Sequence, residues 1–183
     1  MGNFTEMLIF LTTTISSLYI AVVLLRFLLQ LVHADFYNPM SQFIVKATNP
    51  LLIPLRRVIP GIFGIDIASI VLALLLQTLA IEAIYVMQYG QFPSFIAVLI
   101  TSAFKLIAAT LDIYFWALII MVILSWVSPY RGNPVTSLIS SLLYPLLHRI
   151  QQLIPPIGGL DFSPMVAMII IYCLKVLFGV DSY

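Results

Sequence analysis

Long apolar runs alternate with short polar connections along the chain. Residues 94–127 contain no helix breaker, and one helix over them would be about 51 Å long, against a hydrocarbon core of roughly 30 Å. We therefore place the third span at about 106–127 and expect residues 93–104 to form an interfacial or protruding lead-in. The whole pattern predicts about four transmembrane helices, at about 7–31, 65–87, 106–127 and 163–179.

Two of the connections are amphipathic rather than uniformly apolar. In residues 145–155 the apolar side chains recur at helical spacing along one face, and polar side chains occupy the other face. Residues 51–59 show the same pattern, with Arg56 and Arg57 at polar positions. Both segments are too short and too polar to cross a membrane, so we interpret them as helices that lie at the headgroup level. The alternative is that they pack against the protein's own spans.

The same unit occurs twice in the chain, at a spacing of 95 residues. Identical residues at this spacing include Asn38 and Asn133, Pro39 and Pro134, Pro50 and Pro145, Gly64 and Gly159, and Asp66 and Asp161. The repetition predicts a single membrane domain, 1–183, with repeat 1 at about 7–89 and repeat 2 at about 102–180. Each repeat is expected to contain a span, an amphipathic surface helix, a Pro/Gly turn and a second span. The two copies then enter the membrane in the same direction.

Composition restricts the class of protein further. Apolar residues make up 62% of the chain, charged residues make up 8%, and the mean hydropathy is +1.14, which excludes a water-soluble surface. The eight Lys and Arg residues are scattered, so we expect no nucleic acid as a partner. His33 and His148 have no second ligand at metal-binding spacing, and the sequence contains no nucleophile motif. We therefore expect a protein that is not an enzyme and has neither a metal nor a cofactor.

Basic residues in the connections predict the orientation. Lys46, Arg56 and Arg57 lie in the first connection and Arg131 and Arg149 in the third, whereas residues 88–94 carry no charge. Because cytoplasmic loops of membrane proteins are enriched in Lys and Arg, we expect both amphipathic connections to be cytoplasmic. Both termini and the middle loop then lie on the opposite side of a cell inner membrane.

Four charged residues inside the predicted spans are candidate site residues, because a charge at mid-bilayer costs on the order of 3 kcal/mol. Glu82, Lys105, Asp112 and Lys175 fall at similar depths in the four-span arrangement. Three interpretations are open for this intramembrane charge layer. It is an electrostatic clamp between spans, an ion or proton path, or a set of side chains that reach to the headgroups.

Polar residues at the span ends form a second group of candidates. Asp66, Asp161 and Ser163 precede apolar runs and are expected to cap the helices that begin there. Arg26 lies five residues inside the end of the first span. We expect it either to reach to the headgroups or to pair with Asp66 or Asp161.

Five short motifs bear a family resemblance: RFLLQ at 26–30, FYNP at 36–39, RRVIP at 56–60, SW at 125–126 and IPPIGGLDFSP at 154–164. The set resembles the YggT family of small bacterial membrane proteins, which has relatives in plastids, and the match covers nearly the whole chain. Gln151 and Gln152 stand where this family usually has a basic pair. The resemblance implies a four-span, non-enzymatic membrane protein. Members are linked to osmotic or ion-stress tolerance, to envelope processes and, in plastids, to the assembly of membrane complexes.

Two function classes remain from the sequence. The first is an assembly, scaffold or interaction factor of the membrane, which acts with the lipid bilayer and with a membrane-protein partner or a second copy of itself. The second is a small ion transporter or channel component. Few polar residues lie at mid-span, which favours the first class. Its cytoplasmic interaction surface is expected to contain Arg56, Arg57, Leu147, Arg149 and Ile150.

Overall fold

The computed structural model describes residues 2–61, 64–127, 133–154 and 161–178, and this part of the chain is built from six helices. They are α1 (Asn3–Leu31), α2 (Pro39–Val58), α3 (Ile67–Tyr89), α4 (Phe95–Val127), α5 (Pro134–Leu153) and α6 (Ser163–Leu177). Three segments are long and apolar enough to cross a membrane: α1, α3 and residues Phe95–Ser125 of α4. The fourth predicted span corresponds to α6, which is apolar but only 15 residues long.

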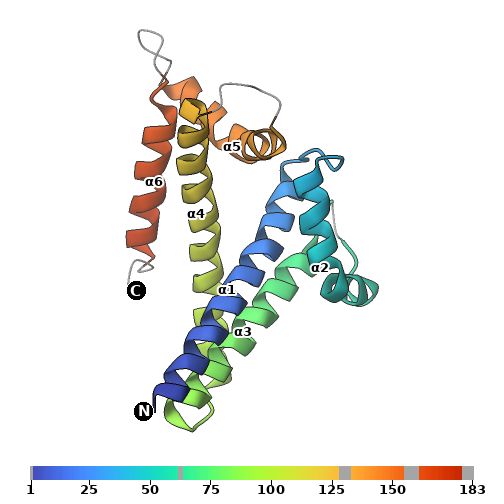
Figure 1. Cartoon of the computed structure of the whole chain (residues 1–183), viewed down its shortest axis with the longest axis vertical. Coiled ribbons are helices and arrows are strands. Elements are labelled where there is room, and N and C mark those ends of the chain that lie inside the picture. Colours follow the sequence, from blue (N-terminus) through green and yellow to red (C-terminus); the bar gives the residue numbers. More distant parts are fainter. Residues whose placement is uncertain (1, 62–63, 128–132, 155–160, 179–183) are drawn as a thin grey trace.

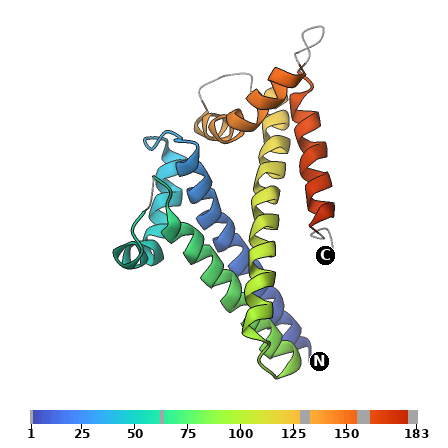
Figure 2. The same ribbon diagram turned by 180° about the vertical axis from the view of Figure 1, so that it is seen from behind.

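The helices follow the predicted order twice. In Figure 1, α1 runs from the N-terminal end of the molecule to the end that carries α2 and α5, and α3 returns. Helix α4 then runs in the direction of α1 and α6 in the direction of α3, which Figure 2 shows from behind. The predicted all-helical fold with two repeats in the same direction is therefore confirmed.

Both amphipathic helices begin with the same cap. The side chains of Asn38 and Asn133 accept hydrogen bonds from the backbone N–H groups of Met40 and Val135, each over 2.9 Å. A proline follows each asparagine, and its fixed φ suits the first position of a helix, where no N–H is needed. The duplicated Asn-Pro pair thus starts α2 and α5 in the same way.

Of the two alternatives for residues 93–104, an interfacial segment separate from the third span is wrong. Helix α4 is continuous from Phe95, and Val98 is 3% exposed. Thr78 of α3 donates a hydrogen bond to Ser102 over 3.1 Å, and both side chains are buried. One face of the first turns of α4 therefore packs against α3, while Phe95, Ile96 and Ile100 are exposed.

The core contains two large clusters, each centred on one repeat. One cluster joins α1, α2 and α3 around Val23 and Leu52, and another joins α4, α5 and α6 around Leu118 and Leu147. Val23 with Leu118, and Leu52 with Leu147, are equivalent positions of the two repeats. The repeats also pack on each other: Leu28 of α1 belongs to the second cluster, and Leu106 of α4 belongs to the first. A third cluster joins Leu29 and Ile44 to Leu138 of α5. The amide Nδ2 of Asn38 adds a polar link by donating to the carbonyl of Pro134 over 2.7 Å.

Candidate functional site

Leu147 and Ile150, two apolar residues of α5, lie against the protein's own helices. Leu147 is 9% exposed and Ile150 is 6% exposed, and both belong to the core cluster of repeat 2. Their assignment to a cytoplasmic interaction surface is therefore corrected, because α4 and α6 cover them. Arg57 and Arg149 are exposed, and the Arg56 side chain is 39% exposed. The basic part of the predicted surface is thus accessible, and its apolar part is not.

Within the predicted charge layer the structure brings together one pair. Lys175 Nζ of α6 lies 2.8 Å from Asp112 Oδ1 of α4, and it lies 5.8 Å from the centre of the Phe115 ring. Glu82 is half-buried on α3 and Lys105 is exposed on α4, and neither forms an ion pair with another described residue. The four charges therefore do not form a single network in the part of the chain that the structure describes.

Arg26 binds neutral oxygens rather than a carboxylate. It is 7% exposed. Its Nη1 donates to the Val45 carbonyl over 3.2 Å, to Thr48 Oγ1 over 2.5 Å and to Asn49 Oδ1 over 2.9 Å. Both predicted alternatives for Arg26 thus differ from the structure, where α2 passes close enough to supply these oxygens.

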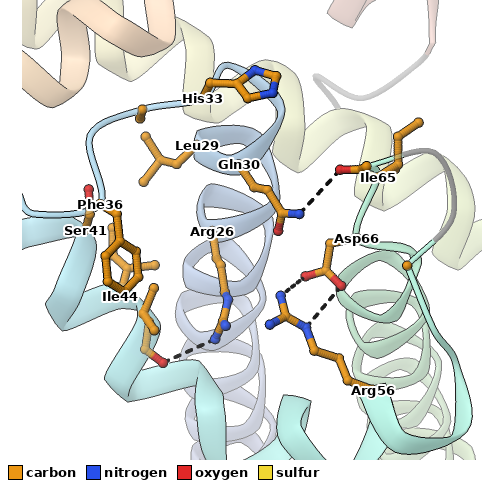
Figure 3. A pocket seen from close by; sticks show the side chains of 14 residues that line it. Arg26, Leu29, Gln30, His33, Phe36, Ser41, Ile44, Arg56, Ile65 and Asp66 are labelled. Atoms are coloured by element: carbon orange, nitrogen blue, oxygen red, sulfur yellow. Dashed lines mark hydrogen bonds and ion pairs between the residues drawn. The ribbon is translucent and has the colours of Figure 1, made fainter.

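A carboxylate and a second guanidinium complete the same junction. Asp66 is 4% exposed, and Arg56 binds it through Nε at 3.3 Å and Nη2 at 2.5 Å (Figure 3). Asp66 occupies the N-cap position of α3, but its side chain makes no cap bond and instead accepts from Ser69 Oγ. Burial raises the pKa of Asp66, but the hydrogen bonds from Arg56 and Ser69 outweigh it and hold the pKa below its ordinary value.

Repeat 2 makes the equivalent contact without a cation. Gln151, at the position of Arg56, donates to Asp161 Oδ2 over 2.9 Å. The other oxygen of Asp161 accepts the backbone N–H of Ser163 over 2.9 Å. The Ser163 hydroxyl and this N–H hold the pKa of Asp161 below its ordinary value. Ser163 is the first residue of α6 rather than its cap. Asp161 thus satisfies the start of α6, as predicted for a capping residue, whereas Ser163 does not cap it.

A cavity of about 710 Å³ lies between α1, α2 and the segment that leads into α3. We call it the junction cavity. Figure 3 shows the side chains that line it. Its polar lining includes Arg26, Gln30, His33, Ser41, Arg56 and Asp66, and its apolar lining includes Leu29, Phe36, Ile44, Val45 and Ile65. The junction cavity is therefore an amphipathic space at one end of the membrane-length helices.

Sequence reasoning missed the partners of Arg26. Thr48 and Asn49 are ordinary polar residues of an amphipathic helix when they are considered alone. Their equivalents in repeat 2 are Leu143 and Tyr144, and the equivalent of Arg26 is Met121. A comparison of the two repeats, position by position, could have identified this polar group, because it occurs in one copy only.

The lowered pKa of Asp66 predicts acid sensitivity. A carboxylate with a lowered folded pKa stabilises the fold at pH values above its ordinary pKa of about 4, and the contribution is lost as pH falls through the folded pKa. We expect the melting temperature in detergent to fall between about pH 5 and pH 2, and to fall less in Asp66→Asn. Thermal unfolding across this range measures both. Equal pH dependence in the two proteins would remove Asp66 as a source of stability.

The paired repeats and the membrane-length helices define a polytopic helical membrane protein with internal duplication. Residues 5–87 and 100–180 both match the family model described as CCB3/YggT. The chain belongs to this family.

Relatives match nearly the full length of the chain. An uncharacterised protein of Pseudomonas aeruginosa is 49% identical over 170 residues, which are 92% of this chain and 86% of that protein. The uncharacterised protein YggT of Escherichia coli K12 is 40% identical over 169 residues, 92% of this chain and 87% of that protein. No solved structure matches the chain significantly. The relatives therefore establish the family without naming an activity.

Proposed function

We propose that this protein is a non-enzymatic scaffold or interaction factor of the bacterial inner membrane. Its partner is another membrane protein or a second copy of the chain, which would bind the outer faces of α2 and α5. With the basic residues of α2 and α5 on the cytoplasmic side, these faces meet partners at the cytoplasmic headgroup level. No catalytic group is required for this role.

One observation carries the proposal: α2 and α5 lie at the same end of the molecule and both keep large apolar side chains exposed. Phe43 of α2 and Tyr144 of α5 are each 64% exposed, although the opposite faces of these helices are packed in the core. Arg57 and Arg149 are exposed on the same two helices. Aromatic and Arg side chains are enriched where proteins bind one another.

The alternative role as an ion transporter has less support. Asp112 and Lys175, which a transporter would need to keep available in the membrane, neutralise each other at 2.8 Å. Glu82 and Lys105 lie on α3 and α4 without an ion-pair partner among the described residues. A continuous path would require polar groups on several helices at matching depth.

Site-specific photo-crosslinking in native membranes tests the proposed surface. With a photo-reactive phenylalanine at Phe43 or at Tyr144, we expect a discrete protein adduct after irradiation, because these side chains would face the partner. The matched control is Leu79, which is 60% exposed on the spanning helix α3 and is expected to contact lipid. An adduct of twice the chain mass would identify a second copy as the partner. Equal labelling at all three positions would contradict the proposal.

A further inference from the structure

The junction cavity combines cationic, hydroxyl and apolar side chains in a single space of about 710 Å³. We propose that it binds a phosphate-bearing anion, supplied as the headgroup of an anionic phospholipid. This site is separate from the partner surface proposed on the outer faces of α2 and α5.

The charges of the cavity suit a monoanion. Arg26 and Arg56 line it together with a single carboxylate, Asp66, so these three groups leave one positive charge. The hydrogen bonds that Arg26 donates within the described part of the chain all leave from Nη1. Its Nε and Nη2 remain to donate to a phosphate, which arginine binds through two parallel N–H groups.

Ser41 provides an independent indication of a ligand. It lines the cavity, it is 6% exposed, and its Oγ has no hydrogen-bond partner among the described residues. Leaving a buried hydroxyl unpaired is unfavourable, so its presence requires an explanation. A phosphate oxygen in the cavity would accept its hydrogen bond.

The second repeat shows that the fold does not require these cations. At the positions of Arg26, Thr48 and Arg56 it has Met121, Leu143 and Gln151, yet α4, α5 and α6 repeat the order and the directions of α1, α2 and α3. Leu143 is fully buried in the core there. Burying a guanidinium costs more than burying methionine unless the charge is compensated. Repeat 2 folds with uncharged residues at these positions. Arg26 and Arg56 of repeat 1 are therefore better explained by the binding of an anion than by a need of the fold.

The position and the walls of the cavity favour a lipid over a free ion. It lies where α1 ends and α3 begins, which is the headgroup level for helices of membrane-spanning length. Leu29, Ile44 and Ile65 form part of its wall. Inorganic phosphate gains nothing from these side chains, whereas the glycerol and first methylenes of a lipid do. Basic pockets between spanning helices are a known form of headgroup site.

Lipid retention by the full-length protein tests the proposal. The delipidated protein in detergent would be titrated with phosphatidylglycerol, and the bound lipid would be counted by native mass spectrometry. We expect one saturable site per chain and an affinity about tenfold lower in Arg26→Met, which places the residue of repeat 2 at this position. Ser41→Leu, which removes the hydroxyl and places a larger apolar side chain at the cavity wall, should also weaken binding and serves if Arg26→Met does not fold.

The matched control is Arg57→Gln, which removes the same charge from α2 outside the cavity and should leave the affinity within about twofold. An equal loss of lipid affinity in Arg57→Gln would overturn the proposed site, because it would show that basic residues attract the lipid wherever they lie on the surface. Unchanged binding in both Arg26→Met and Ser41→Leu would overturn it as well. Displacement of the lipid by inorganic phosphate at similar concentration would show that a free anion, not a lipid, is the ligand.

Discussion

Leu147→Glu and Leu52→Glu are each expected to abolish the folded protein. Leu52 is fully buried and Leu147 is 9% exposed, at equivalent positions of the two core clusters. A carboxylate there would be buried among the apolar side chains of the core clusters, so we expect the free energy of unfolding to fall by more than about 4 kcal/mol. Thermal unfolding and gel filtration in detergent measure the loss.

The neighbouring positions provide controls with the same substitution. Leu51 is 44% exposed and Leu153 is 82% exposed, so Leu51→Glu and Leu153→Glu should each cost less than about 1 kcal/mol. If Leu147→Glu stays folded while Leu153→Glu does not, the stripe of α5 faces outward and its assignment to the core is wrong.

Separating Asp112 from Lys175 is the second large effect that we expect. Lys175→Met leaves the Asp112 carboxylate in the membrane-length helix α4 without its 2.8 Å contact, at a cost of about 3 kcal/mol, and Asp112→Asn removes the same contact from Lys175. The double variant should lose less stability than the sum of the single variants, because each single variant already removes the contact between the two side chains. The melting temperatures of the unmodified protein, the two single variants and the double variant in detergent measure this double-mutant cycle.

Lys105→Met is the matched control for this cycle. Lys105 also lies on α4, but it is exposed and has no ion-pair partner among the described residues. Its removal should change the melting temperature little and should show no coupling to Asp112→Asn. Strictly additive effects of Asp112→Asn and Lys175→Met would show that the contact contributes nothing to stability.

Elements marked by repeated residues could be predicted from the sequence. Asn38 and Asn133 begin their helices with the same side-chain contact, and a local contact of this kind depends only on neighbouring residues. Asp66 and Asp161 likewise accept from the residues ten positions before them, Arg56 and Gln151. The duplicated turn therefore indicated the architecture correctly.

Whether lipid or protein covers an apolar helix face could not be predicted in the same way. The spacing of Leu147 and Ile150 shows that they share a face, but lipid and protein are both apolar surroundings. Only the path of α4 and α6 decides between them. Residues 93–104 gave the same difficulty, because the length of a helix does not reveal the neighbour that covers its additional turns.

The environment of Arg26 was missed for a different reason. The partners expected for Arg26 were carboxylates, but a buried guanidinium can instead be satisfied by neutral oxygens, here those of Val45, Thr48 and Asn49. Carbonyl, hydroxyl and amide oxygens occur throughout the sequence, so their presence does not identify the partners of one arginine. Distances across two helices were needed to find them.

The amide of Asn38 gives one of the two Asn-Pro motifs a constraint that the other lacks. Its Oδ1 caps α2 while its Nδ2 holds the Pro134 carbonyl, whereas Asn133 uses Oδ1 for the cap of α5. Aspartate caps a helix about as well as asparagine does. At position 133 the exchange keeps the cap, but at position 38 it would set a carboxylate oxygen against a carbonyl oxygen. The two asparagines therefore differ in the substitutions that they tolerate. Among the described residues, Asn38 also joins the two repeats, whereas Asn133 only caps its helix.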